Sequence, residues 1–194
     1  MSDETLEKKD KFKILVSRIK ENSRKIILGF LIIIVIFFVL AILENKKKRK
    51  DVLISEEFNS AKILIKNEKR QEGLIILERI VDKKNKVYSP LSLYLIIDFQ
   101  LEKDKEKIIK MFDKIISIKK IDEENIKLIK IKKALFLSEN YSEQEMLDIL
   151  NPIINSDSVW RSYAINLLID YFTNKGSFTK AEQYKNLINK KDNK

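Results

Sequence analysis

An apolar run near the start of the chain constrains its fold more than any other feature. The run begins at Ile26 and ends at Leu43, and none of its 18 residues is charged or polar. As an α-helix it would cover about 27 Å, close to the hydrocarbon thickness of a bilayer. Because a helix buried in a soluble domain is rarely apolar on every face, the run predicts a transmembrane helix over residues 26–43, in contact with membrane lipids.

A cleaved secretory signal peptide is the alternative interpretation of this run, because the residues before it are basic. Two features oppose it. The run is longer than the apolar region of most signal peptides, and Glu44 and a basic cluster, residues 46–50, follow it instead of a cleavage site of small residues. We therefore expect an uncleaved anchor between a basic N-terminal tail, residues 1–25, and a basic juxtamembrane linker, residues 44–50.

The side of the membrane on which the rest of the chain lies is not decided by charge. Residues 11–25 carry six Lys and Arg and residues 44–58 carry five, so the two flanks are nearly equal under the positive-inside rule. Apolar residues of the tail recur at helical spacing: Phe12, Leu15, Val16 and Ile19. This pattern fits a basic amphipathic helix on an anionic leaflet and equally a solvated tail.

Composition excludes several classes of function for the rest of the chain. There is no Cys and no His, which excludes disulfides, thiol nucleophiles, imidazole bases and zinc sites built from these ligands. The net charge of +10 is concentrated near the run: residues 1–50 hold 13 Lys and Arg against six Asp and Glu, leaving 26 against 23 for the other 144 residues. We therefore expect no nucleic-acid binding, no cofactor, no metal, no small-molecule substrate and no catalysis.

After residue 50, apolar residues recur at helical spacing between short polar breaks. The clearest helix carries one stripe of apolar and aromatic residues: Trp160, Tyr163, Ala164, Leu167, Leu168, Tyr171 and Phe172. Gly176 suits the left-handed residue that ends this helix. The next helix, beginning near Ser177, is expected to bury four residues: Phe178, Ala181, Tyr184 and Ile188.

Three further segments complete the helical interpretation. Residues 91–101 are apolar nearly all round, as expected for a helix packed on both sides. Ser142 and Glu145 form a capping box that opens a helix. Residues 126–131, which read IKLIKI, nearly alternate as in a strand, but Ala134 continues a helical face, so we expect a helix there too.

The resulting pattern is eight helices in four pairs. The second helices of the pairs are anchored at Gly73, Ile108, Met146 and Ala181, at intervals of 35, 38 and 35 residues. These intervals are close to the 34-residue period of tetratricopeptide repeats. The prediction is an all-α fold: the transmembrane helix, a tetratricopeptide-like (TPR-like) α-solenoid of about four helix pairs over residues 51–190, and a disordered tail, residues 191–194.

Stacked helix pairs present a concave face built from the first helix of each pair, where a peptide or a partner helix can lie. In the last pair, the residues off the buried stripe are Asn166, Asp170 and Thr173, and Tyr163 lies at its border. These four are the candidate partner contacts. Trp160 falls on the stripe, so we expect it to pack in the core and not to anchor a partner.

Several parts of the chain resemble the YfgM-like tetratricopeptide-repeat family: the basic tail and single span, a first helix reading SEEFNSAKILIKN, and a final segment reading LNPIINSDSVWRSYAINLLIDYFTNKGSFTKAEQYKNLI. The positions that carry the likeness are Phe58, Ala61, Pro152, Trp160, Arg161, Ala164, Gly176 and Ala181. Gly176, Phe178 and Ala181 resemble the family's turn Gly-x-aromatic-x-x-Ala. The earlier turns lack the Gly and the Ala.

The resemblance implies a single-pass protein of the bacterial inner membrane, with its N-terminus in the cytoplasm and its C-terminal domain in the periplasm. It also implies a scaffold or holdase for protein–protein interaction, whose partners are the SecYEG translocon, periplasmic chaperones or exported chains. The basic cluster 46–50, directly after the span, favours the alternative of a cytoplasm-facing membrane adaptor or tether of the same fold.

Overall fold

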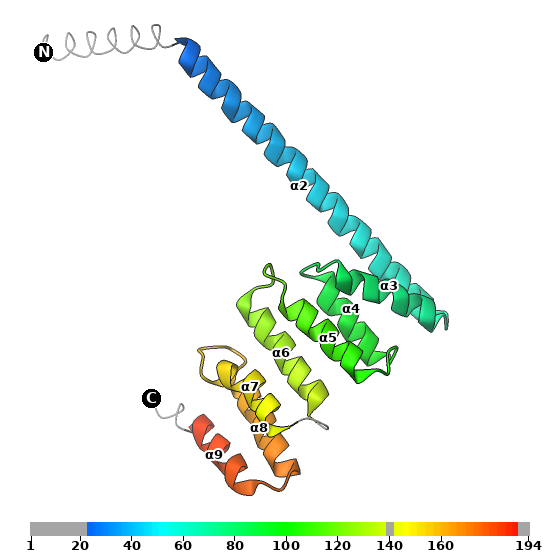
Figure 1. Cartoon of the computed structure of the whole chain (residues 1–194), viewed down its shortest axis with the longest axis vertical. Coiled ribbons are helices and arrows are strands. Elements are labelled where there is room, and N and C mark those ends of the chain that lie inside the picture. The colour runs from blue at the N-terminus through cyan, green and yellow to red at the C-terminus, as the bar shows by residue number, and fades with distance from the viewer. Residues whose placement is uncertain (1–22, 139–141, 190–194) are drawn as a thin grey trace, which may run out of the picture. The chain divides into compact units, whose positions relative to one another are not determined.

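Residues 23–138 and 142–189 are described by the computed structural model (Figure 1). Their secondary structure is helical, with no strand in these two ranges, so the predicted all-α fold is confirmed. Most of the basic tail, and residues 191–194, lie outside the described residues. The helices of these ranges are α2 (Ser23–Lys66), α3 (Arg70–Asp82), α4 (Tyr88–Asp98), α5 (Lys105–Ile116), α6 (Glu123–Leu137), α7 (Glu143–Ile154), α8 (Arg161–Asn174) and α9 (Phe178–Asn189).

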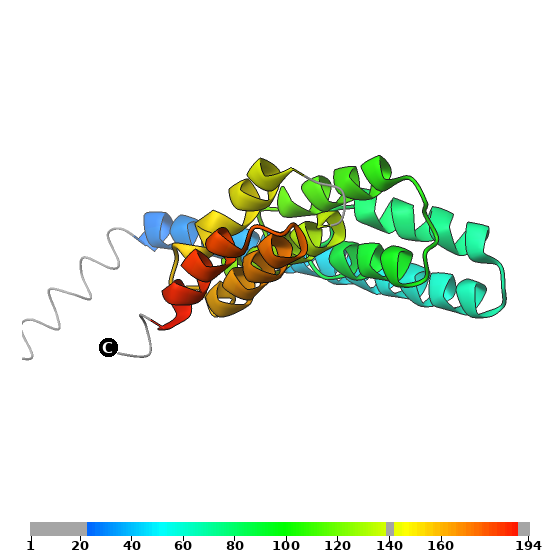
Figure 2. The same ribbon diagram turned by 90° about the horizontal axis from the view of Figure 1, so that it is seen from below.

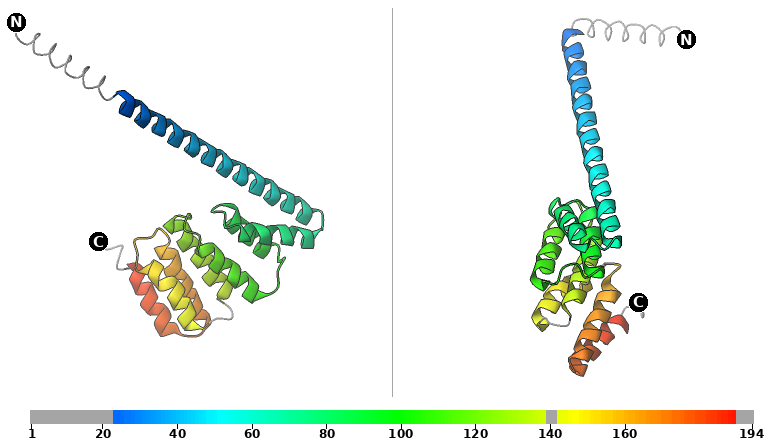
Figure 3. Two further views of the ribbon diagram at one scale, coloured as in Figure 1. Left: turned by 45° about the horizontal axis from the view of Figure 1, so that its top comes forward. Right: turned by 90° about the vertical axis from the view of Figure 1, so that its right-hand side faces the viewer.

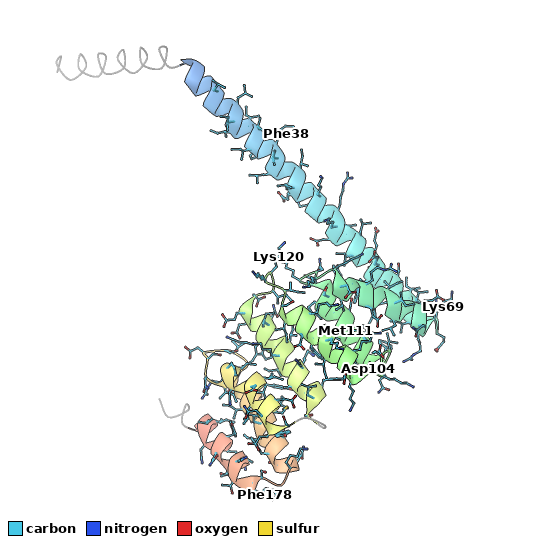
Figure 4. The ribbon with its side chains drawn as sticks, viewed as in Figure 1. Phe38, Lys69, Asp104, Met111, Lys120 and Phe178 are labelled. Atoms are coloured by element: carbon cyan, nitrogen blue, oxygen red, sulfur yellow. The ribbon has the colours of Figure 1, made fainter. Side chains whose placement is uncertain are left out.

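The chain divides into two compact units, Met1–Val52 and Leu53–Lys194, and α2 runs through the division. In the first unit the described apolar side chains stand exposed around α2; Phe38, for example, is 68% exposed (Figure 4). No helix has, over its described residues, an apolar stretch long enough to cross a membrane. Residues 44–50, expected as a linker, are helical within α2.

Polar side chains cap the starts of helices in the second unit. The Asp104 carboxylate accepts hydrogen bonds from the backbone N–H groups of Glu106 at 2.9 Å and Lys107 at 3.3 Å. Ser142 and Glu145 form the predicted capping box, each side chain accepting from the backbone N–H of the other. Because these N–H groups have no partner inside their helix, the caps fix where α5 and α7 begin.

Each helix from α3 to α9 packs against its neighbour in the chain (Figure 2 and Figure 3). We call the part of α2 in the second unit, α4, α6 and α8 the first helices, and α3, α5, α7 and α9 the second helices. The second helices contain Gly73, Ile108, Met146 and Ala181, in the predicted order. Residues 126–131 are helical within α6, as predicted.

Two hydrophobic clusters form the core of the second unit and meet in α6. The first joins α2 to α6 around Phe112, and the second joins α6 to α9 around Phe172; both phenylalanines are buried. Within α6, Ile129 belongs to the first cluster and Ile131 to the second. This single helix therefore connects the two halves of the core.

Gly73 lets α3 approach α2 closely. A Cβ atom at this position would lie 2.6 Å from Cγ1 of Ile65 and 3.2 Å from the carbonyl oxygen of Ala61. Both distances are shorter than ordinary contacts, so any larger residue would push the two helices apart. Gly176 has a different role: its φ of 71° provides the left-handed turn after α8, as predicted.

Two predictions about the last helix pair are wrong. Tyr163, placed on the buried stripe, is 51% exposed, whereas Ile165, off the stripe, is buried. The reason is that α8 packs against both α7 and α9, so its buried face includes Ile165 and is turned away from Tyr163. Phe178, expected in the core, is 68% exposed because it is the first residue of α9 and its side chain points back beyond the helix start. Trp160 is partly buried against the second cluster.

Candidate protein-binding surface

Three hollows open between consecutive first helices: between α2 and α4, between α4 and α6, and between α6 and α8. None of the residues that line them comes from a second helix. We call the surface formed by these residues the hollowed face. It comprises Lys62, Ile65, Lys66, Lys86, Val87, Pro90, Leu91, Tyr94, Leu95, Phe99, Lys120, Ile121, Asp122, Asn125, Leu128, Ile129, Leu135, Ser138, Leu167, Asp170, Tyr171, Asn174 and Lys175.

The hollow between α2 and α4 has apolar walls and a basic rim. Ile65, Leu95 and Phe99 form the walls, and Lys62 and Lys66 stand at the edge, in a volume of about 260 Å³. Phe99 is 46% exposed. A large apolar side chain left this open to water is a typical anchor point for a partner's apolar group.

The hollow between α4 and α6 is larger, about 470 Å³. Tyr94 lies in its wall, where burial raises the pKa of the phenol to about 12. The Nζ atom of Lys132, next to the hollow on α6, lies 4.6 Å from the centroid of the Tyr94 ring, a cation–π contact. Lys120, in the turn before α6, extends away from the helices at the rim (Figure 4).

The hollow between α6 and α8, also about 470 Å³, receives one of the four candidate contacts, Asp170, beside Leu135. The other three candidates, Tyr163, Asn166 and Thr173, are exposed on α8 but line none of these three hollows. The Thr173 hydroxyl donates a hydrogen bond to the Ile169 carbonyl at 2.7 Å, within its own helix. The structure therefore brings only Asp170 to the hollowed face.

Six exposed lysines line the hollowed face or stand directly beside it. Among the described residues, none of the six forms an ion pair with a carboxylate. The face itself contributes two carboxylates, and Asp122 is already bonded to the backbone N–H of Asn125 at 2.9 Å as the cap of α6. The hollowed face is therefore positively charged. The six lysines are Lys62, Lys66, Lys86, Lys120, Lys132 and Lys175.

Three lysines of the second helices, in contrast, pair with carboxylates of the preceding second helix. Lys107 and Lys114 on α5 reach Glu78 and Asp82 on α3. Lys180 on α9 reaches Glu143 on α7 at 2.5 Å. These pairs join successive repeats on the side of the unit that the hollows do not occupy.

Lys107 is the most connected of these lysines. Its Nζ atom lies 2.7 Å from Oε2 of Glu102 and 2.6 Å from Oε1 of Glu78. Hydrogen bonds to Glu102 first, and to Glu78, raise the pKa of Lys107 well above its ordinary value. The same bond to Lys107, with a backbone N–H bond from Asp104, lowers the pKa of Glu102. Glu102 and Lys107 therefore stay charged over a wider range of pH in the folded state than in the unfolded state.

Glu124 ties the third helix pair to the fourth. Its Oε2 atom accepts hydrogen bonds from the Ser158 hydroxyl at 2.7 Å and from the backbone N–H of Val159 at 3.2 Å. A bond to Lys127, followed by the bond from Ser158, lowers the pKa of the Glu124 carboxyl. The carboxylate therefore fixes the loop between α7 and α8 against the start of α6.

Sequence reasoning missed most of the hollowed face. Its exposed apolar residues include Val87, Leu91, Phe99 and Leu135, each 41–50% exposed. Residues 91–101 were expected to be buried on both sides, and this is wrong for Leu91 and Phe99 because one side of α4 faces the hollows. The nearly continuous apolar character of that segment was the available signal, since an apolar face without a covering helix is an interaction surface.

No group of three or more acidic side chains in the described part of the chain is placed to hold a metal ion. In comparisons with known proteins, no family model matches the chain, and no curated protein or solved structure is significantly similar to it.

Proposed function

We propose that this chain is a membrane-anchored TPR-like scaffold that binds other proteins on the hollowed face. The observation that carries the proposal is the series of three hollows between consecutive first helices, with exposed apolar side chains in each. A peptide or helix lying across the first helices would cover these side chains. The hollows are open and separate, which suits binding of a chain segment better than chemistry on a small molecule.

The solenoid part of the proposal rests on the helix order. Four pairs, with second helices at intervals of 35, 38 and 35 residues, share a hydrophobic core that passes from pair to pair through α6. Helix pairs that cannot bury their apolar faces alone stack in this way in tetratricopeptide proteins. The proposal therefore assigns the second unit to a TPR-like solenoid.

The anchor is proposed on the sequence of residues 26–43. These 18 uncharged residues lie within the 44-residue helix α2, and those whose side chains are described, such as Phe37 at 74%, are exposed. Positions 26, 27, 29, 30 and 41 of the run are not among the described side chains. Exposed apolar side chains around a helix of this length suit contact with lipid.

The resemblance to the YfgM-like family supports a place for the second unit in the periplasm of a bacterium. The proposed role there is that of a scaffold or holdase next to the SecYEG translocon, with periplasmic chaperones or exported chains as partners. The alternative is a cytoplasm-facing adaptor or tether, favoured by the five basic residues 46–50 after the run.

Topology can be tested with one introduced thiol, because the natural chain has no Cys. Asn186→Cys places a thiol at an exposed position of α9. A membrane-impermeant maleimide is expected to label this variant in intact spheroplasts. Labelling only after lysis would favour the cytoplasmic alternative, and release of the chain from membranes by alkaline carbonate would contradict the anchor.

Partner binding can be tested by introducing carboxylates on one face of the unit at a time. Leu91→Asp with Leu135→Asp places two carboxylates in the hollowed face, whereas Ile75→Asp places one on α3, at a position 49% exposed. We expect the double variant to lose proteins that co-isolate with the full chain from detergent-solubilised membranes, and the Ile75 variant to keep them. Equal recovery from both variants would contradict the proposal.

A further inference from the structure

We propose that the hollowed face takes an extended, acidic segment of a partner protein, with an apolar side chain seated in the hollow between α2 and α4. This deepens the proposed function and rests on it, because it names the chemistry of the partner. It is carried by three observations: the unpaired lysines, the apolar walls of one hollow, and the series of hollows across four helices.

The positive charge of the hollowed face favours an acidic partner. The six lysines on or beside the hollowed face have no carboxylate partner among the described residues, whereas Lys107, Lys114 and Lys180 of the second helices are paired across the repeats. Three of the six lie over aromatic rings, but none of the six charges is balanced by a carboxylate in the described part of the chain. A segment carrying Asp and Glu would supply the missing carboxylates, and attraction between opposite charges would both speed association and fix its register.

The hollow between α2 and α4 selects the apolar anchor. Its walls are Ile65, Leu95 and Phe99, and only Lys62 and Lys66 bring charge, at the rim. A volume of about 260 Å³ suits one aromatic or branched aliphatic side chain. Acidic residues on either side of that anchor would meet the two rim lysines. The hollow and its rim are therefore suited to bind an apolar residue flanked by carboxylates.

The spacing of the helices favours an extended segment. Packed helices lie roughly 8–10 Å apart and hollows separate the consecutive first helices, so the four first helices span at least about 30 Å. An extended chain covers about 3.3 Å per residue, so at least about nine residues are needed to cross the whole face. An acidic segment of this length would reach the lysines of all three hollows.

Residues 1–25 and 190–194 are not the proposed occupant. Residues 190–194 hold three Lys against one Asp, so the six lysines would repel them. Residues 1–7 are acidic, with Asp3, Glu4 and Glu7 and no Lys or Arg, but the proposed span over residues 26–43 puts them on the other side of the membrane from the hollowed face. The proposed occupant is therefore a segment of another protein.

A peptide pair provides the direct test. The probe is a fluorophore-labelled twelve-residue peptide in which Asp and Glu alternate with Leu and one Phe, and its control has Lys at every acidic position. With the full chain in non-ionic detergent, anisotropy is expected to show at least tenfold tighter binding of the acidic peptide. Its affinity should fall at least fivefold between 50 and 500 mM NaCl, because salt screens the charges.

Two matched sets of substitutions locate the binding. Each replaces four lysines by Gln, and circular dichroism checks that both variants stay folded. We expect the first set to weaken binding of the acidic peptide at least tenfold and the second to leave it within twofold. The first set is Lys62, Lys66, Lys86 and Lys120 on the hollowed face, and the second is Lys103, Lys105, Lys110 and Lys185 elsewhere on the second unit.

The outcomes separate this proposal from the proposed function. Equal binding of the two peptides, equal loss in the two lysine sets, or equally tight binding of a twelve-nucleotide single-stranded DNA would overturn the acidic-segment proposal. If in that case the Leu91→Asp, Leu135→Asp variant still loses its co-isolated proteins, the protein-binding function stands with a different partner chemistry. If that variant keeps them, both proposals fail.

Discussion

The two sides of the helical-repeat unit use lysine in opposite ways. On the second helices, Lys107, Lys114 and Lys180 pair with carboxylates of the preceding second helix and join successive repeats. On or beside the hollowed face, six lysines have no such partner in the described part of the chain, and apolar side chains near them stay open to water. The ion pairs of one side stay within the unit, and we propose that the other side binds a partner.

The difference between the two sides shows which surface charges indicate a binding site. A surface ion pair contributes little to stability, usually less than about 1 kcal/mol, so pairing alone identifies no site. Like charges gathered on one face without partners repel each other in the folded state, and a bound acidic partner would relieve that repulsion. Variants outside the hollowed face should therefore change the free energy of unfolding, and variants of the hollowed face should change partner binding.

The largest contrast is expected for the same substitution on buried and open phenylalanines. Phe112→Ala empties the first core cluster and should lower the free energy of unfolding by about 3–5 kcal/mol. Phe99→Ala, at a position 46% exposed, should cost about 1 kcal/mol or less and weaken partner binding instead. Urea denaturation of both variants checks this. Similar losses of stability would mean that Phe99 belongs to the core.

Gly73→Ala is expected to give the next largest loss. The added methyl group would lie 2.6 Å from Ile65 Cγ1, and relieving such overpacking costs about 1–3 kcal/mol. The better helix propensity of Ala returns up to about 1 kcal/mol. A net loss of about 1–2 kcal/mol should appear in thermal denaturation. A gain in stability would show that α3 can move away from α2 without loss.

A matched pair of serine substitutions compares a hydroxyl that caps a helix with a buried hydroxyl that has no hydrogen-bond partner among the described residues. Ser142→Ala removes the capping box of α7 and should cost about 1 kcal/mol. Ser92→Ala removes a buried hydroxyl that has no hydrogen-bond partner among the described residues, so stability should stay the same or rise slightly. Melting curves of the two variants are expected to shift in opposite directions or by clearly different amounts. Equal losses would contradict the assigned roles.

The Lys107 cluster predicts a pH dependence with two limits. The lowered pKa of Glu102 adds stability that is present above its ordinary pKa of about 4.5 and is lost as pH falls through the lowered value. The raised pKa of Lys107 adds stability that is complete below about 10.5 and is lost as pH rises through the raised value. Lys107→Gln should reduce both dependences in urea titrations at pH 3–11. Unchanged profiles would place the pH dependence in other groups.

The smallest expected effect has the opposite sign. Replacing Lys62 and Lys66 by Gln removes repulsion on the hollowed face and should raise stability by a few tenths of a kcal/mol at low salt. Lys107→Gln, on the other side, should lower it. Chemical denaturation at 20 mM and 500 mM NaCl checks both, since salt should remove the gain. A loss of stability in the first variant would mean that the contact of Lys62 with the Phe58 ring, or an ion pair at the rim, outweighs the repulsion.

Local signals in the sequence were enough to predict the helices. The capping box at Ser142, the left-handed turn at Gly176 and the apolar spacing in residues 126–131 act within a few residues of each other. The order of the pairs also follows from spacing alone. These features need no knowledge of what packs against what.

The hollowed face could not be predicted in the same way, because it depends on contacts between repeats. Glu78 and Lys107 are 29 positions apart, and no sequence pattern indicates that they pair while Lys62 and Lys120 do not. Of the four candidate contacts on α8, only Asp170 lines a hollow. Exposure of Phe178 likewise depends on where α9 starts, which a repeating stripe does not give.

Photo-crosslinking at matched apolar positions tests the central claim most directly. A photoreactive residue is placed at Leu91 or Leu135 on the hollowed face, or at Ile75 on α3, with similar exposure at all three positions. In intact membranes of cells that carry the full chain, the account predicts crosslinked partner proteins from Leu91 and Leu135 and none from Ile75. Crosslinks from Ile75 alone, or the same products from all three positions, would contradict the assignment of partner binding to the hollowed face.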